Sequence, residues 1–204
     1  MRTKIKICGL KTIQDISFAN SLLPDFIGFI FVPESKRFVE VSTALTLRRE
    51  LKPEIRSVGV FVNAPVETVL SLADQGLFSL IQLHGQENEA YVQRLKASCG
   101  LPVIKAFSVS SFRDVENALA FPSDYLLFDH GKGGTGQTFD WSLLQRTDRP
   151  VFLAGGLNSD NVAAAVKCVQ PDVVDISSGV EYEDVLIKGK DESKVKAFIN
   201  AVNN

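Results

Sequence analysis

The chain has 204 residues, of which 45% are hydrophobic and 23% are charged, so it suits one globular domain with a sizeable core. Its formal net charge is −2 and its pI is near 5.7, so no basic field is present to recruit nucleic acid. No stretch approaches the ~18–20 apolar residues of a membrane span, which excludes a membrane partner of that kind.

The cysteines and the first residues indicate the cellular location. Cys8, Cys99 and Cys168 are far apart and have no CxxC spacing, which argues against a disulfide framework. The segment 1–7 carries charges where a signal peptide would need an apolar core. We therefore expect a cytoplasmic protein.

Eight short apolar runs, each bounded by Gly, Pro or polar residues, predict eight strands. In chain order they are Lys4–Cys8, Phe26–Val32, Ser57–Val62, Ser79–Leu83, Val103–Phe107, Tyr125–Asp129, Val151–Ala154 and Val173–Ser177.

Amphipathic patterns between these runs predict helices. Thr12 can cap the first helix, with Asp15 three residues later. One face of that helix should carry Ile13, Ile16, Ala19 and Leu23. Pro65 is suited to begin another helix, since proline is tolerated in the first helical turn. The sixth helix is predicted to be short, little more than Trp141–Gln145. The last helix should cover Glu192–Val202.

Strands that alternate with helices predict parallel pairing with right-handed crossovers. Eight such units can close into a (βα)8 barrel, an α/β fold with one closed parallel sheet, and we expect residues 1–204 to form this single domain. An open doubly wound sheet is the alternative. In a barrel the chemistry lies at the carboxyl ends of the strands.

Residues at the predicted strand ends are the candidates for a functional site. They are Cys8, Arg37, His84, Asp129, Gly131–Gly136, Gly155, Gly156, Asp175, Ser177, Ser178 and Gly179. The glycine-containing turns after the last two strands are where many barrels hold a phosphate group on backbone N–H groups, although helix–strand packing also explains paired glycines.

The segment Gly131–Gly136 matches G-x-G-x-x-G and follows a strand. A dinucleotide site would also need a long helix from the third glycine and a second strand that ends in an acid, and the sequence provides neither. A mobile loop over an active site is the better interpretation.

Cys8 and Asp129 each allow two interpretations. Cys8 can be a small buried hydrophobic residue, or a thiolate base if neighbouring cations stabilise it. Asp129 can cap a loop, or can keep its proton in a closed pocket and act as an acid. The two histidines, His84 and His130, have no paired spacing, so a metal site is not supported.

Several segments together resemble the phosphoribosylanthranilate isomerase family, in family order along nearly the whole chain. They are Lys6–Leu10, Gly28–Phe31 with Ser35–Arg37, Val58–Asn63, Ile81–Gly85, Leu127–Asp129, Gly133–Gly136 with Thr138–Trp141, Ala154–Asn158 and Val174–Glu181. After Glu181, the segment Tyr182–Lys188 is longer and more apolar than the short turn of the family.

The resemblance implies a (βα)8 barrel that converts N-(5-phosphoribosyl)anthranilate by an Amadori rearrangement in tryptophan biosynthesis, without a metal or an organic cofactor. The implied roles are Cys8 as general base, Asp129 as general acid, Arg37 facing the anthranilate carboxylate, and Asp175 and His84 as substrate contacts. The implied phosphate cradle comprises Gly155, Gly156, Ser177, Ser178 and Gly179. The partner is a small phosphosugar, and we expect a monomer.

Two other functions share the barrel and the phosphate site. A metal-dependent pentulose-phosphate epimerase would need more strand-end ligands than His84, Asp129 and Asp175. A non-catalytic phosphosugar-binding barrel would have no need of both Cys8 and Asp129.

Overall fold

The computed structural model describes residues 2–130, 138–144, 147–184 and 186–203. Its strands are β1 (Lys4–Cys8), β2 (Phe26–Ile30), β3 (Arg56–Phe61), β4 (Leu80–Leu83), β5 (Val103–Ser108), β6 (Tyr125–Asp129), β7 (Val151–Leu153) and β8 (Val173–Ile176). The α-helices in these ranges are α1 (Ile13–Leu22), α2 (Val41–Glu50), α3 (Val66–Asp74), α4 (Glu89–Cys99), α5 (Phe112–Ala120), α6 (Val162–Val169) and α7 (Glu192–Asn203). Two short 3-10 turns follow β6 and β8, namely η1 (Trp141–Leu143) and η2 (Ser178–Val180).

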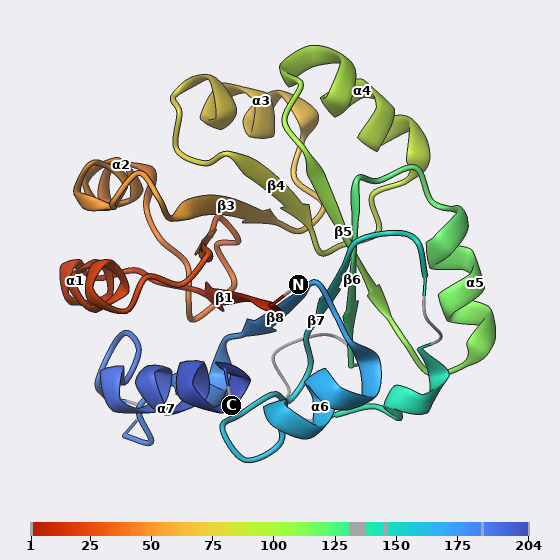
Figure 1. Ribbon diagram of the computed structural model, residues 1–204. Helices are drawn as coiled ribbons and strands as arrows, with labels where there is room; N and C mark the ends of the chain where they lie inside the picture. The colour runs from red at the N-terminus through yellow and green to blue at the C-terminus, as the bar shows by residue number, and fades with distance from the viewer. Residues whose placement is uncertain (1, 131–137, 145–146, 185, 204) are drawn as a thin grey trace.

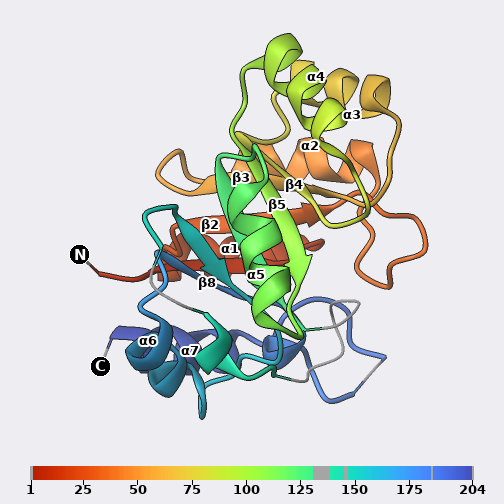
Figure 2. The ribbon, with the colours of Figure 1, turned by 90° about the vertical axis from the view of Figure 1, so that its right-hand side faces the viewer.

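The strands form a closed parallel barrel in chain order, with helices around it (Figure 1). Closure is made by β1 and β8, where Lys6 lies opposite Asp175 in the register. An open doubly wound sheet has two edges and cannot make this pairing, so the barrel prediction is confirmed. Seen from the side, α6 and α7 lie across the barrel from α3 and α4 (Figure 2).

All eight predicted strands are present, with bounds that agree to within two residues. The predicted α-helices are also present, apart from the sixth. There the described residues show only the 3-10 turn η1, while Gln145 and the predicted loop Gly131–Gly136 lie outside the described residues. That residues 1–204 form a single domain stays a prediction.

The start of α1 confirms the predicted cap, but its apolar face is only half as expected. Thr12 accepts a hydrogen bond from the Asp15 N–H, and Asp15 accepts one from the Thr12 N–H, which completes a capping box. Ile16 and Ala19 are buried as predicted, whereas Ile13 is 58% exposed and Leu23 is 50% exposed. Leu23 is in the left-handed region, with φ of 51°, and caps the helix instead of continuing its face.

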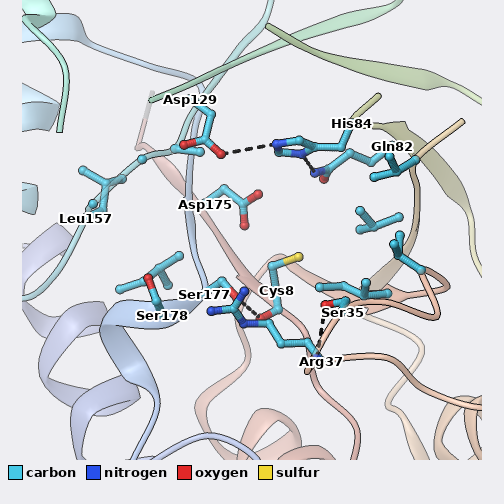
Figure 3. Close-up of a pocket in the computed structure, with 18 residues that line it drawn as sticks. Cys8, Ser35, Arg37, Gln82, His84, Asp129, Leu157, Asp175, Ser177 and Ser178 are labelled. Atoms are coloured by element: carbon cyan, nitrogen blue, oxygen red, sulfur yellow. Dashed lines mark hydrogen bonds and ion pairs between the residues drawn. The ribbon is translucent and has the colours of Figure 1, made fainter. Parts of the chain in front are cut away.

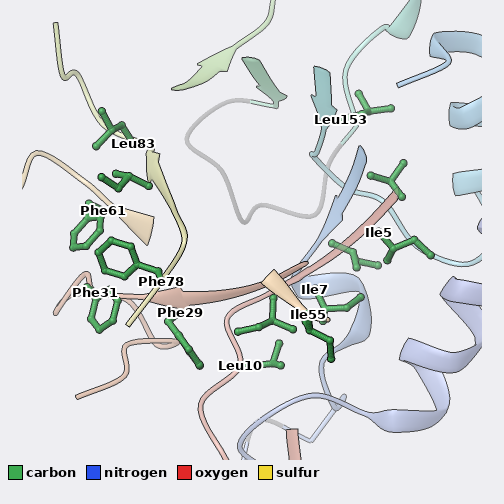
Figure 4. Close-up of a cluster of buried hydrophobic side chains, with 14 of the residues drawn as sticks. Ile5, Ile7, Leu10, Phe29, Phe31, Ile55, Phe61, Phe78, Leu83 and Leu153 are labelled. Carbon is green, nitrogen blue, oxygen red and sulfur yellow. The ribbon is translucent and has the colours of Figure 1, made fainter. Parts of the chain in front are cut away.

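Alternate residues of each strand divide the apolar core into two clusters. Side chains such as Ile5, Ile7 and Phe29 face the helices and belong to the larger cluster. Figure 4 shows part of this cluster, in which the rings of Phe61 and Phe78 pack edge to face with centroids 5.6 Å apart. Each fully buried side chain of this size contributes about 1.5–3 kcal/mol to folding.

The second cluster fills the barrel interior. It contains Phe26, Ile30, Val58, Val60, Leu80, Ile104, Leu127, Phe152 and Val173, with Cys8 among them. The polar interior positions of β1, β4, β6 and β8 lie next to this apolar plug, near the carboxyl ends of the strands. Apolar side chains therefore fill the barrel interior, and buried polar side chains lie next to them at the carboxyl ends of the strands. Within the described ranges, no helix combines the length and hydrophobicity needed to cross a membrane.

Candidate active site

A cavity of about 220 Å³ lies at the carboxyl ends of the strands. Nine of the ten predicted site residues line it, namely Cys8, Arg37, His84, Asp129, Gly155, Gly156, Asp175, Ser177 and Ser178. The side chains of the seven that are not glycine converge on this cavity from β1, β6, β8 and the adjoining loops (Figure 3). The strand-end rule for barrels thus brings together residues that are up to 170 positions apart.

Cys8 lies beside a buried ion pair on the floor of the cavity. Lys6 is two residues earlier on β1, so its side chain points into the barrel on the same side as that of Cys8. Lys6 is fully buried, and its Nζ lies 2.7 Å from Asp175 Oδ2. Burial alone would lower the pKa of Lys6, but Asp175 and Cys8 raise it above its ordinary value, so the ammonium stays charged.

The thiol of Cys8 is under two opposing influences. Burial raises its pKa, and the Lys6 ammonium next to it opposes that rise without cancelling it. At neutral pH Cys8 is therefore mainly the thiol. A further positive charge near the sulfur would be needed to make the thiolate abundant.

Gly28 leaves the space that the Cys8 sulfur occupies. The two residues are register partners on β1 and β2. A Cβ atom on residue 28 would lie 2.7 Å from Cys8 Sγ, which is closer than packed atoms tolerate. Glycine at this position therefore lets the sulfur lie against β2.

Asp129, His84 and Gln82 form a hydrogen-bonded chain on the far wall from Cys8 (Figure 3). His84 Nε2 lies 3.3 Å from Asp129 Oδ2, and Gln82 Nε2 lies 3.1 Å from His84 Nδ1. Gln82 thus contacts one ring nitrogen of His84, and Asp129 lies against the other. The other oxygen of Asp129 accepts the His130 N–H at 2.7 Å.

Gly155 gives Asp129 its room. It follows β7 with φ of 86°, and a Cβ atom there would lie 2.8 Å from the His130 nitrogen and 2.9 Å from Asp129 Oδ1. Glycine is therefore favoured at this position both by the positive φ and by the lack of space for a Cβ atom.

The turns after β7 and β8 carry the residues that the resemblance assigns to a phosphate site. Gly156 also has a positive φ, of 62°, and its carbonyl accepts a hydrogen bond from the Asn161 side chain at 2.9 Å. The Ser177 hydroxyl donates to the Cys8 carbonyl at 3.0 Å, and Ser178 begins η2. Gly179 does not line the cavity: it packs against the Leu157 carbonyl, which a side chain would strike.

Arg37 lies on the wall formed by the loop after β2. Its Nε donates to Glu181 Oε1 at 2.5 Å. Its Nη2 is buried and has no hydrogen-bond partner among the residues that the structure describes. The guanidinium therefore has donors to offer to an anion in the cavity.

Comparison with known proteins decides the family. The family model described as N-(5'-phosphoribosyl)anthranilate (PRA) isomerase matches residues 5–201. The enzyme of that name from Caldanaerobacter subterraneus subsp. tengcongensis is 44% identical over 205 residues, which cover 98% of this chain and 97% of the relative. The chain belongs to the phosphoribosylanthranilate isomerase family.

Solved structures of phosphoribosylanthranilate isomerases share the whole barrel. The Thermotoga maritima enzyme superposes with a TM-score of 0.90 at 37% identity, covering 98% of both chains. A second structure, at 35% identity and a TM-score of 0.86 with the same coverage, holds reduced 1-(o-carboxyphenylamino)-1-deoxyribulose 5-phosphate. The resemblance inferred from sequence segments is thus confirmed.

Sequence reasoning missed several polar residues of this phosphoribosylanthranilate isomerase site. Lys6 and Gln82 had a usable signal, because each lies two residues before a predicted site residue on the same strand and so on the same face. Glu181 ends the segment Val174–Glu181 that resembles the family, but nothing in the sequence indicated its contact with Lys190, because an antiparallel bridge brings the two together only in the folded loop. In the described part of the chain, no group of three or more His, Cys, Asp or Glu residues is arranged to hold a metal ion.

Proposed function

We propose that the chain catalyses the Amadori rearrangement of N-(5-phosphoribosyl)anthranilate to 1-(2-carboxyphenylamino)-1-deoxyribulose 5-phosphate in tryptophan biosynthesis. The observation that carries this proposal is that Cys8 and Asp129 line one cavity from opposite walls, together with Arg37 and the turn that contains Ser177 and Ser178. A relative with the same fold binds a reduced form of this product.

The two ends of the cavity suit the two anionic ends of that substrate. Arg37 offers unpaired N–H donors to the anthranilate carboxylate. The backbone N–H groups of Gly155 and Gly156, with Ser177, Ser178 and the adjacent η2, face the phosphate. Clamping both ends holds the ribose between Cys8 and Asp129, which is where the reaction takes place.

The first step opens the ring. Asp129 gives a proton to the furanose ring oxygen, the bond from that oxygen to C1′ breaks, and the nitrogen lone pair forms a C1′=N bond with a positive charge. His84 hydrogen-bonds the same carboxyl group and stabilises the negative charge that remains on it.

The second step moves a proton from carbon. Cys8 thiolate takes the C2′ hydrogen, and the electron pair neutralises the imine to give an enolamine. The imine cation provides the further positive charge that the buried thiol needs, in addition to Lys6. Asp175 Oδ1 has no partner among the described residues and can accept a hydrogen bond from a ribose hydroxyl. Tautomerisation of the enolamine gives the ketose without any oxidant or reductant.

One assay tests this function. Purified protein added to phosphoribosylanthranilate should remove the fluorescence of that substrate, and EDTA should not slow the reaction. Loss of activity on chelation would support the epimerase type of site, and binding without turnover would support a phosphosugar-binding barrel.

The monomeric state, the cytoplasmic location and the absence of a cofactor stay predictions. Among the solved relatives is a dimeric isomerase from Thermotoga maritima. The mass of this protein in solution, 22.4 kDa for a monomer or twice that value for a dimer, therefore tests the monomeric state.

A further inference from the structure

Glu181 is held in place by the chain on both sides of it. It directly follows η2, and it pairs with Lys190 in an antiparallel bridge that closes the loop between them. The Lys190 N–H donates to Asp15 Oδ1 of α1 at 2.8 Å. The backbone at Glu181 is therefore fixed although the loop that follows it is irregular.

The carboxylate of Glu181 accepts from three cations. Arg37 Nε lies 2.5 Å and Lys190 Nζ 3.2 Å from Oε1, and Lys36 Nζ lies 2.8 Å from Oε2. Burial would raise the pKa of Glu181, but these cations outweigh burial and lower the pKa to about 2. Glu181 is therefore ionised at any pH where the enzyme works.

This contact determines how Arg37 lies. A guanidinium has five N–H donors in one plane, so a carboxylate on Nε fixes the direction of the two remaining nitrogens. The aliphatic part of Arg37 passes over Gly9, where a Cβ atom would lie 2.9 Å from Arg37 Cδ. With the stem and Nε both held, the Nη groups stay directed at the cavity that Arg37 lines.

Lys190 connects the same carboxylate to Ser177, on the turn after β8. Its Nζ is buried and donates to the Ser177 carbonyl at 2.9 Å and to the Ser177 hydroxyl at 3.2 Å. Ser177 in turn lies on the turn that faces the phosphate. Glu181 is thus one hydrogen bond from Arg37 and, through Lys190, two hydrogen bonds from Ser177.

We propose that Glu181 is a positioning residue that directs Arg37 at the substrate carboxylate. This inference rests on the proposed function. It assigns to Glu181 a contribution to affinity that depends on the ligand having a carboxylate, although Glu181 itself is anionic and touches no ligand.

The test compares two ligands by calorimetry. One is the reduced product analogue, and the other is its counterpart with a phenyl group in place of the 2-carboxyphenyl group. Glu181→Gln should weaken binding of the first by about tenfold and leave the second within about twofold, because only the first uses Arg37. On an Arg37→Ala background, Glu181→Gln should cause no further loss with either ligand.

Two more variants complete the design. Glu183→Gln removes the same charge from the same loop, but Glu183 is 92% exposed and pairs only with Lys194 among described residues, so it should bind both ligands like the wild type. Glu181→Asp keeps the charge between the lysines and should fold even if Glu181→Gln does not. Its shorter side chain should lose the contact with Arg37, and with it the same carboxylate-dependent affinity.

Two results would overturn the inference: unchanged affinity for the carboxylate ligand, or an equal loss for both ligands, which would make Glu181 a general support of the loop. A wild-type protein that binds neither ligand would overturn the proposed function itself, and the inference with it.

Discussion

Cys8 and Gly28 are direct partners across β1 and β2, and a methyl group on Gly28 would lie 2.7 Å from the Cys8 sulfur. The position of the candidate base is therefore set by a residue with no side chain. The other requirements of the site can be tested in the same way, one contact at a time.

Gly28→Ala should push the Cys8 sulfur away from β2 and lower kcat by at least about tenfold, since displacements near 1 Å can cost ~10²-fold. Gly59→Ala is the matched control. It strikes the Phe78 ring on the helix side of the barrel, so it should lower Tm by overpacking yet keep kcat per folded molecule. Equal kcat in the two variants would contradict the role of Gly28.

Cys8→Ser should fold normally and lose at least ~10²-fold in kcat, because a hydroxyl is a far poorer base. In the wild type, burial raises the thiol pKa, so the thiolate fraction grows about tenfold per pH unit below that pKa. The rate at which iodoacetamide alkylates Cys8, followed by mass spectrometry of the peptide that contains it, should accordingly rise about tenfold per pH unit between pH 6 and 8. An active serine variant would exclude Cys8 as the base, and an alkylation rate that does not change with pH would contradict the raised thiol pKa.

Asp129→Asn keeps the shape of the side chain but cannot give a proton to the ring oxygen. We expect near-normal binding of the reduced product analogue and a loss of at least ~10²-fold in kcat. If Asp129 is only a loop cap, the variant will instead have a lower Tm and an ordinary kcat. Measuring both quantities on one preparation separates the two roles.

Lys6→Met should be strongly destabilising, because it leaves the buried Asp175 carboxylate without its cation at a cost of about 3–5 kcal/mol. The double variant Lys6→Met/Asp175→Asn removes both charges and should regain much of the lost Tm. Both variants should remain poor catalysts, since neither has an ammonium beside Cys8. Recovery of kcat together with Tm would show that the pair is purely structural.

Glu181 should make the protein sensitive to acid. Its pKa is about 2 in the folded state and near 4.5 ordinarily, so its ion pairs contribute their full stability above pH 4.5 and lose it as the pH falls toward 2. The Tm difference between the wild type and Glu181→Gln should therefore shrink from pH 6 to pH 3. A constant difference would mean that the charge of Glu181 contributes nothing to stability.

The sequence was sufficient for the barrel because its eight strands are short apolar runs that need only local pattern to be recognised. The sequence was also sufficient to predict that Cys8 and Asp129 line one cavity, because strand ends meet at one rim in this fold. It could not reveal that Arg37 depends on Glu181, since that contact requires a loop with no periodic pattern to fold back through Lys190. It also did not predict that Leu23 turns outward, because the left-handed cap belongs to the folded backbone.

The pairing of β1 with β8 also bears on how the enzyme comes into being. Lys6 on β1 is translated 169 positions before Asp175 on β8, so during synthesis the lysine lacks this carboxylate partner until β8 has been made. Burying that ammonium early would be costly, which favours leaving the seam between the first and last strands open until the end. A barrel that still lacks β8 therefore lacks both the strand that closes it and the carboxylate that pairs with Lys6 next to the Cys8 thiol.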